Sequence, residues 1–194
     1  MITARSLGRR FGEKRVLRGL DLDVAPGDFL LVTGPNGSGK STLLGLLAGL
    51  LAPTEGELTV ELARGRIGYL AHEPLVYREL TALENLDLYG RLYRIPERRE
   101  WIGMVLERFG LWDARHERVD SFSRGMTQRL ALCRTLLHEP RLLLLDEPYS
   151  SLDADAARIV DDLVSESAAA KTFVVATHDP ARIRELATQE LALG

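Results

Sequence analysis

The sequence has a single cysteine, no apolar run long enough to cross a membrane, and no excess of charge of one sign. One cysteine excludes a disulfide framework and a zinc site built from cysteines. The longest apolar run, Leu43–Ala52, has ten residues, whereas a membrane-spanning helix needs about 20. With 25 basic and 28 acidic residues among 194, the chain lacks the dense positive charge of a dedicated nucleic-acid-binding protein.

The N-terminus carries Arg5, Arg9 and Arg10, but no apolar segment follows them as it would in a signal peptide. We therefore expect the chain to stay in the cytoplasm, so that any work at a membrane requires a separate partner. The length suits one domain, or two closely associated subdomains, with a hydrophobic core that is stable without a metal ion or disulfide bonds.

Short apolar runs alternate with helical patterns, which predicts an α/β fold. The predicted strands are Thr3–Leu7, Leu20–Val24, Phe29–Val32, Glu57–Glu61, Arg66–Leu70, Leu142–Leu145, Phe173–Ala176 and a short last strand. The predicted helices are Lys40–Leu50, Asp153–Val164, about Pro180–Ala187, and a helical segment between Ala82 and Leu137. We expect a core subdomain of about residues 1–70 and 140–194, with a helical subdomain of about 82–137 inserted.

The helical segment carries two apolar stripes with helical spacing. The first consists of Trp101, Ile102, Val105, Leu106 and Phe109, with Gly110 where a helix C-cap belongs. The second consists of Met126, Leu130, Cys133 and Leu137, and Pro140 ends it. The lone cysteine is therefore expected to be a buried core residue.

The strongest chemical signal is a glycine-rich segment between a predicted strand and a predicted helix: Gly34-Pro35-Asn36-Gly37-Ser38-Gly39-Lys40-Ser41-Thr42. It fits the phosphate-binding pattern G-x-x-x-x-G-K-[ST]. Its glycines let backbone N–H groups turn towards the β- and γ-phosphates, and the N-terminus of the following helix adds a partial positive charge. Lys40 supplies a cation, and the Ser41 hydroxyl can ligate Mg²⁺. Because the chain has only three lysines, we discount a chance match.

Two carboxylates, Asp146 and Glu147, follow the four-leucine run of a predicted strand. The carboxyl ends of parallel strands form the edge where ligands bind in open α/β sheets. We expect Asp146 to hold Mg²⁺ through water and Glu147 to act as the general base on the attacking water. Without other signals, two acidic residues after an apolar strand merely end the strand about as often as they form a functional site. The prediction therefore depends on the phosphate loop.

A third segment, Ser123-Arg124-Gly125-Met126-Thr127-Gln128-Arg129, precedes a predicted helix and resembles the signature sequence of ATP-binding cassette (ABC) ATPases. Ser123 and Gly125 match its phosphate-binding positions, whereas Phe122, Arg124 and Met126 depart from the family consensus. An ordinary serine N-cap is the plain alternative. The resemblance continues in family order, with Ser150–Asp153 resembling the D-loop, Ala176–Asp179 resembling the switch-histidine loop, and Phe11 at the place of the adenine-stacking aromatic.

This resemblance implies an ATPase whose nucleotide lies between the phosphate loop of one copy and the Ser123–Gly125 segment of a second copy. His178 would sense the γ-phosphate. A homodimer would then close around ATP and Mg²⁺, and each chain would drive a separate transmembrane permease subunit, with no nucleic acid involved. The plain alternatives are another bacterial ABC exporter or a soluble, non-transport ABC ATPase.

One position departs from the family. His72 stands where the family usually has a glutamine that ligates Mg²⁺, and either His72 or its neighbour Glu73 could take that role. The stretch Gly68–Tyr93, with Glu79–Leu86 inside it, resembles the ATPase of the haem exporter used in cytochrome c maturation. The resemblance implies that a membrane partner docks near His72–Arg78, with Leu75, Val76 and Tyr77 as expected contacts, although these side chains could equally pack under the loop.

Overall fold

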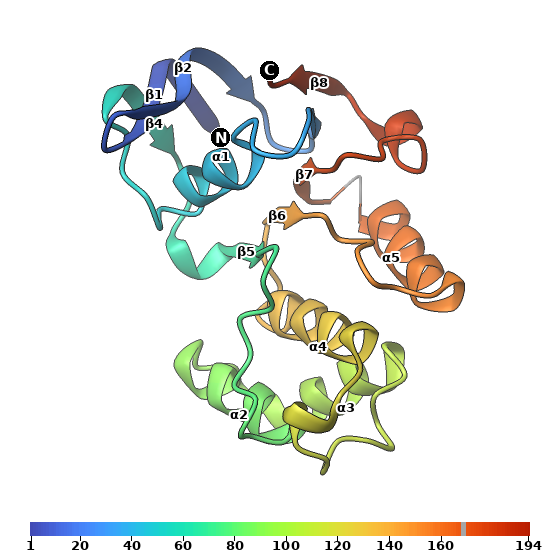
Figure 1. Cartoon of the computed structure of the whole chain (residues 1–194). Coiled ribbons are helices and arrows are strands. Elements are labelled where there is room, and N and C mark those ends of the chain that lie inside the picture. The colour runs from blue at the N-terminus through green and yellow to red at the C-terminus, as the bar shows by residue number, and fades with distance from the viewer. Residues whose placement is uncertain (168–169) are drawn as a thin grey trace. The chain divides into compact units, whose positions relative to one another are not determined.

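The computed structural model describes residues 1–167 and 170–194, and the chain forms two compact units (Figure 1). The sheet unit consists of Met1–His72, Arg141–Pro148 and Ser167–Gly194. The helical unit consists of Glu73–Pro140 and Tyr149–Glu166. Within the described residues, no helix combines the length and the apolar character needed to cross a bilayer.

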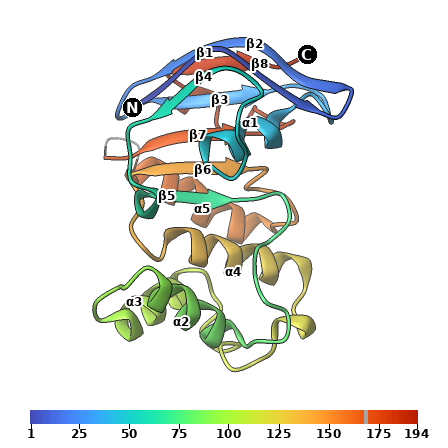
Figure 2. The same ribbon diagram turned by 90° about the vertical axis from the view of Figure 1, so that its left-hand side faces the viewer.

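The sheet unit contains two sheets, whose strands run across the view in Figure 2. An antiparallel sheet has the order β2-β1-β4, with bounds Lys14–Val24, Ile2–Phe11 and Glu55–Val60. A parallel sheet has the order β5-β6-β7-β3-β8, with bounds Ile67–Leu70, Leu142–Asp146, Thr172–Ala176, Phe29–Thr33 and Gln189–Ala192. Strands β6 and β7 are buried along their whole length, as expected for continuous apolar runs covered on both faces.

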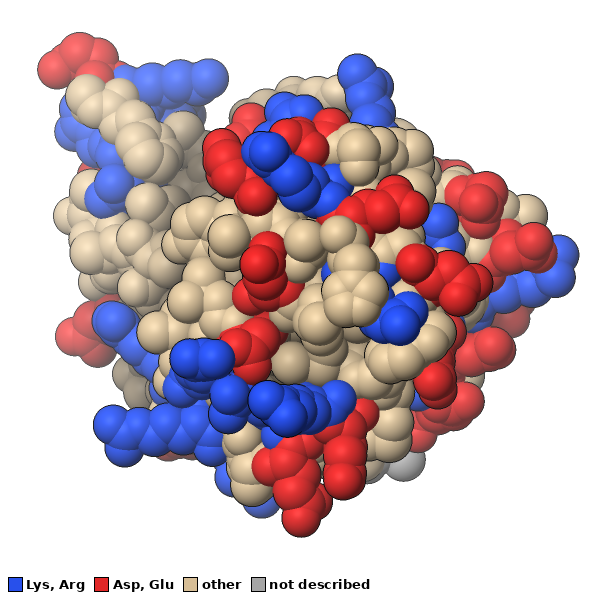
Figure 3. Space-filling view, turned by 90° about the horizontal axis from the view of Figure 1, so that it is seen from below, with Lys and Arg blue, Asp and Glu red and all other residues tan. Residues whose placement is uncertain are grey.

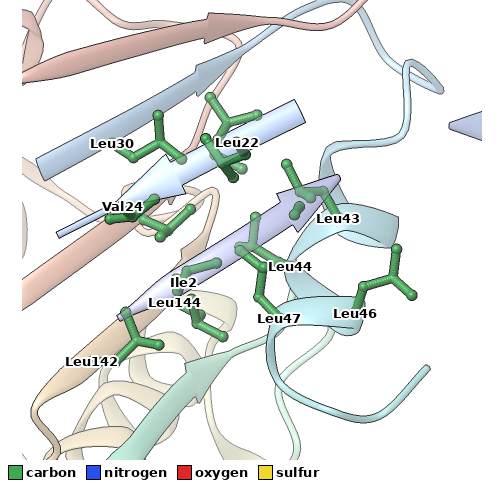
Figure 4. Close-up of a cluster of buried hydrophobic side chains, with 14 of the residues drawn as sticks. Ile2, Leu22, Val24, Leu30, Leu43, Leu44, Leu46, Leu47, Leu142 and Leu144 are labelled. Atoms are coloured by element: carbon green, nitrogen blue, oxygen red, sulfur yellow. The ribbon is translucent and has the colours of Figure 1, made fainter. Parts of the chain in front are cut away.

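Helix α1 (Lys40–Leu47) lies in the core of the sheet unit. Its four leucines, 43, 44, 46 and 47, are at most 1% exposed, because residues of both sheets pack around them (Figure 4). Helix α1 is shorter than the predicted 40–50 helix. Its end follows from Gly49, which adopts φ +68° and donates its N–H to the Leu46 carbonyl.

Four helices belong to the helical unit: α2 (Ala82–Leu92), α3 (Arg98–Arg108), α4 (Arg124–Leu136) and α5, which runs over Ala154–Ser167 and ends at the boundary. A reciprocal capping box between Thr81 and Glu84 starts α2. Both apolar stripes are largely confirmed, since their buried members are Ile102, Leu106, Phe109, Leu130, Cys133 and Leu137. Gly110 follows α3 at φ +61°, as a C-cap glycine does.

Two further features of the chain differ from the sequence prediction. The predicted 180–187 helix is only a short 3₁₀ turn at Arg184–Leu186, because its last N–H groups bond three residues back, from Leu186 to Ile183 and from Ala187 to Arg184. Most of α5 falls in the helical unit and not in the range predicted for the core subdomain. At its end, Glu166 pairs with Arg108 of α3 at 2.7 Å, a contact between segments far apart in the sequence.

Candidate functional site

The glycine-rich loop connects β3 to α1, as predicted, and its backbone needs glycine at two close approaches. Gly34 adopts φ +144°, and a Cβ there would collide with the Leu193 carbonyl oxygen. Gly39 adopts φ +105°, and a Cβ there would lie 2.9 Å from the Leu17 side chain. The loop is therefore pressed against β2 on one side and the end of the chain on the other, which fixes its path.

Lys40 starts α1 and folds back over the loop. Its Nζ donates hydrogen bonds to the carbonyl oxygens of Gly34, at 2.7 Å, and Pro35, at 3.1 Å. The residue is only 7% exposed, so the ammonium is held inside the curve of the loop. The buried Ser38 hydroxyl has no hydrogen-bond partner among the described residues. A loop that holds the Lys40 ammonium inside its curve and leaves the Ser38 hydroxyl without a partner suits a phosphate ligand.

Asp146 ends β6 and is 2% exposed. Burial raises the pKa of its carboxyl above the ordinary value, while the Ser41 hydroxyl bonded to it, His72 and Lys40 act in the opposite direction. Its Oδ2 is buried without a hydrogen-bond partner in the described part of the chain. A buried carboxylate with a free oxygen beside a serine hydroxyl offers the hard oxygen donors that Mg²⁺ prefers.

Glu147 adopts φ +50°, unusual for a residue with a side chain. This turn directs its carboxylate towards the end of β7. Oε2 accepts a bond from the Thr177 hydroxyl at 3.1 Å and lies 2.9 Å from His178 Nδ1, while Oε1 accepts from the His178 N–H at 2.9 Å. These contacts use three of the roughly four acceptor positions of a carboxylate, so one is left for a further donor such as water.

His72 is the last residue of the sheet unit and is exposed, yet it lies near enough to Asp146 to lower the pKa of that carboxyl. Glu73 is the first residue of the helical unit. An imidazole is a poorer Mg²⁺ ligand than an oxygen, so a contact of His72 to a metal-bound water fits this chemistry better than direct ligation. The choice between His72 and Glu73 stays a prediction.

Phe11 ends β1 and is 45% exposed. Its ring is covered on one side by the guanidinium of Arg9, whose Cζ lies 4.5 Å from the ring centroid. The register pairs Phe11 with Lys14 and Arg9 with Leu17 on β2. Leu17 approaches the phosphate loop at Gly39, so Phe11 lies two residues along β1 from the register partner of a residue that meets the loop.

The Ser123–Gly125 segment lies in the helical unit at the start of α4. The Ser123 side chain accepts a hydrogen bond from the Met126 N–H at 3.2 Å and so caps this helix. At Gly125, a Cβ would lie 2.9 Å from the Ser151 carbonyl oxygen. The helical unit thus brings the predicted signature segment against the predicted D-loop, and glycine permits the close approach.

The sheet unit brings together the loop residues Lys40 and Ser41, the carboxylates Asp146 and Glu147, and His178, at the carboxyl ends of β3, β6 and β7. Sequence reasoning missed Thr177 as an individual residue. It is 3% exposed, and its hydroxyl donates to Glu147 and accepts from the Asp179 N–H. A hydroxyl residue directly before His178, at the end of an apolar strand, was the available signal.

Comparison with known proteins places these observations in a family. A family model described as ABC transporter matches residues 17–150. The uncharacterized ABC transporter ATP-binding protein YxlF of Bacillus subtilis (strain 168) is 38% identical over 184 residues, which cover 92% of this chain and 62% of that protein. The ergothioneine transport ATP-binding protein EgtV of Helicobacter pylori (strain G27) is 32% identical over 207 residues, covering 100% of this chain and 97% of that protein.

A solved structure is also similar to this chain. It is a dimeric structure of a post-hydrolysis state of the ATP-binding cassette MJ0796 bound to ADP and Pi, with a TM-score of 0.89 and 29% identity over 100% of this chain and 94% of that chain. The predicted fold class is confirmed by this match. Some relatives are longer, since the chain spans about three fifths of YxlF and of YdbJ, another Bacillus subtilis (strain 168) protein.

Proposed function

The chain belongs to the ABC transporter ATP-binding family, and from this premise we propose that it binds ATP at Gly34–Thr42 and hydrolyses it to power transport. One observation carries the proposal: the buried carboxylate of Asp146, the bonded Glu147–His178 pair and the inward Lys40 ammonium occupy one edge of the parallel sheet. Phosphoryl transfer needs mainly positioning and charge stabilisation, and this edge offers both.

Glu147 acts as the general base in this proposal. Its free acceptor position receives a proton of the attacking water. The Thr177 hydroxyl, the backbone N–H of His178 and the His178 Nδ1 hold the carboxylate in place. His178 is two-thirds exposed at its side chain (67%), so its Nε2 can reach a γ-phosphate without leaving Glu147. The role of His178 is then to report the presence of that phosphate.

Magnesium is the metal that the donor set fits. Asp146 through a water on its free Oδ2 and Ser41 through its hydroxyl would hold it, and His72 or Glu73 would contact a bound water. Among the described residues no group of three or more acidic, histidine or cysteine side chains forms a metal site, in line with a cation that arrives with the nucleotide. When bound, Mg²⁺ neutralises phosphate charge.

A second copy completes the site in this proposal, since Ser123 and Gly125 of one chain contact the nucleotide held by the other. The exposed Ser123 hydroxyl at the start of α4 supports the idea, because a helix N-terminus favours an anion. The similar MJ0796 structure is a dimer with ADP and Pi, which also supports it. A single chain is then expected to bind ATP but to hydrolyse it very slowly.

The proposed partner is a separate transmembrane permease subunit, so the chain works on the cytoplasmic face of the membrane. Leu75 and Tyr77, 45% and 51% exposed, are the proposed docking contacts, together with Val76. Hydrogen bonds from α2 fix the backbone of their loop. The Tyr89 hydroxyl donates to the Leu75 carbonyl, and the Asn85 side chain accepts from the Tyr77 N–H and donates to the Tyr77 carbonyl. The face in Figure 3 mixes both charge signs, which favours this partner over nucleic acid.

For the transported molecule, the more specific proposal is haem, exported for cytochrome c maturation, and it rests on the sequence Gly68–Tyr93 alone. EgtV is named for ergothioneine transport, and other relatives are named for daunorubicin resistance and for lipoprotein release. Export of another cargo is therefore the competing proposal. Co-purification of the chain with its membrane subunit and the bound ligand distinguishes the two, since a haem Soret band in that complex supports the first.

The test of ATP binding is Lys40→Ala. Removing the ammonium from the loop is expected to weaken MgATP binding at least tenfold, because it takes a full charge away from the phosphates. Titration of a fluorescent ATP analogue measures this, with Lys171→Ala as a matched control in the same unit. Unchanged affinity in Lys40→Ala would refute nucleotide binding at this loop.

A further inference from the structure

The guanidinium of Arg9 is fixed between a backbone carbonyl and an aromatic ring. Its Nη1 donates a hydrogen bond to the Ala52 carbonyl at 2.8 Å, and its Cζ lies 4.5 Å from the centroid of the Phe11 ring. Its Nε is buried with no hydrogen-bond partner in the described residues. The group therefore gives up part of its hydration and holds its place through one hydrogen bond and the ring.

This contact has two consequences for Phe11. One ring face is covered by the guanidinium, so an exposed aromatic side chain that would otherwise rotate freely is held in one orientation. The cation also draws electron density from the ring, which makes its remaining surface a better partner for an electron-rich aromatic plane. The residue remains 45% exposed, so that surface is available.

The hairpin places this pair next to the phosphate loop. Arg9 pairs in register with Leu17, and both Leu17 and Val16 approach Gly39, where a Cβ would meet them at 2.9 and 3.1 Å. A ligand whose phosphates lie on that loop can therefore extend a base towards Phe11. Of the nucleobases, purines present the largest electron-rich face.

We propose that Arg9 is a positioning residue for the base of a purine nucleoside triphosphate, acting through the ring of Phe11. The proposal rests on the proposed binding of ATP at Gly34–Thr42 and adds a determinant of affinity for the base. It assigns Arg9 no contact with phosphate. Arg9 therefore affects ligands that carry a base and leaves ligands without one unaffected.

The test compares ATP with inorganic tripolyphosphate, which has the phosphates but no base, on the Arg9→Met variant. Methionine keeps the unbranched stem and removes the cation. We expect the Kd for ATP to rise about two- to fivefold, because the Phe11 ring loses its fixed orientation and its polarisation by the cation, and the Kd for tripolyphosphate to stay unchanged. Arg9→Lys should restore most of the ATP affinity, because a cation again covers the ring. In a Phe11→Ala background, Arg9→Met should have no further effect.

Arg10→Met is the matched control, since it removes the same charge from the adjacent position, where Arg10 pairs with Glu13 at 3.7 Å. Equal weakening of ATP and tripolyphosphate in Arg9→Met would overturn the proposal, because Arg9 would then act on phosphate or on the fold. Tighter or unchanged ATP binding would overturn it as well. If neither ligand binds the parent chain, the proposed function itself fails, and this outcome is distinct from the others.

Discussion

Replacing Glu147 by glutamine separates catalysis from binding at this site. Glutamine has the same shape, and its oxygen can still accept the His178 N–H that now lies 2.9 Å from Oε1. Its amide group can face Thr177, whose hydroxyl can accept as well as donate. Two of the three contacts are therefore preserved, the one with Thr177 in the reverse direction, and we expect the free energy of unfolding to change by less than about 1 kcal/mol.

The lost property is basicity. General-base catalysis contributes about 10²–10⁴-fold, or roughly 2.7–5.4 kcal/mol of the activation barrier. We expect kcat to fall by that factor while the Kd for MgATP stays within about threefold of the parent value. Because hydrolysis is what separates the proposed dimer, Glu147→Gln should also accumulate a dimer in the presence of ATP.

Phosphate release at saturating MgATP measures the first effect, and size-exclusion chromatography with and without ATP measures the second. Glu147→Asp is the companion variant, since it keeps a carboxylate but shortens its reach, and it should retain more activity than the glutamine variant. Hydrolysis near the parent rate in Glu147→Gln would refute the assignment of the general base.

Three further predictions test other parts of the molecule. Ser123→Arg should abolish hydrolysis while a single chain still binds ATP, and loss of ATP binding by the monomer would contradict a role in the opposite copy. His72→Gln should keep basal ATPase activity but change its stimulation by the membrane subunit, so unchanged stimulation argues against a special role for this histidine. Phe109→Ala should lower the free energy of unfolding by about 3–5 kcal/mol in urea titrations, because Phe109 is fully buried, and a loss below 1 kcal/mol would contradict that packing.

The buried strands and the phosphate loop could be predicted from sequence because each is encoded locally. Four consecutive leucines before Asp146 are apolar on both faces of a strand, and the observed strand is buried throughout. The glycine pattern of the loop likewise contains its own backbone requirements, as Gly34 illustrates. In these cases a few neighbouring residues determine the local structure.

Features that depend on distant residues were not predictable in the same way. The contact of Thr177 with Glu147 joins the ends of two strands 30 positions apart; the sequence next to Thr177 can mark that residue, but it does not identify Glu147 as its partner. The pairing of Glu166 of α5 with Arg108 on another helix joins residues 58 positions apart. The 180–187 segment contains residues that accept a helix, yet it closes as a 3₁₀ turn before β8 begins at Gln189.

The hydroxyl group of Ser123 can accept one hydrogen bond and donate another. Its oxygen accepts the Met126 N–H through a lone pair, and the hydroxyl hydrogen remains able to turn towards another acceptor. Capping of α4 therefore holds the Oγ of Ser123 in place before any ligand arrives. For the anion that we propose to bind there, the position of this oxygen is already fixed in the folded chain, so association has only the hydroxyl hydrogen left to orient.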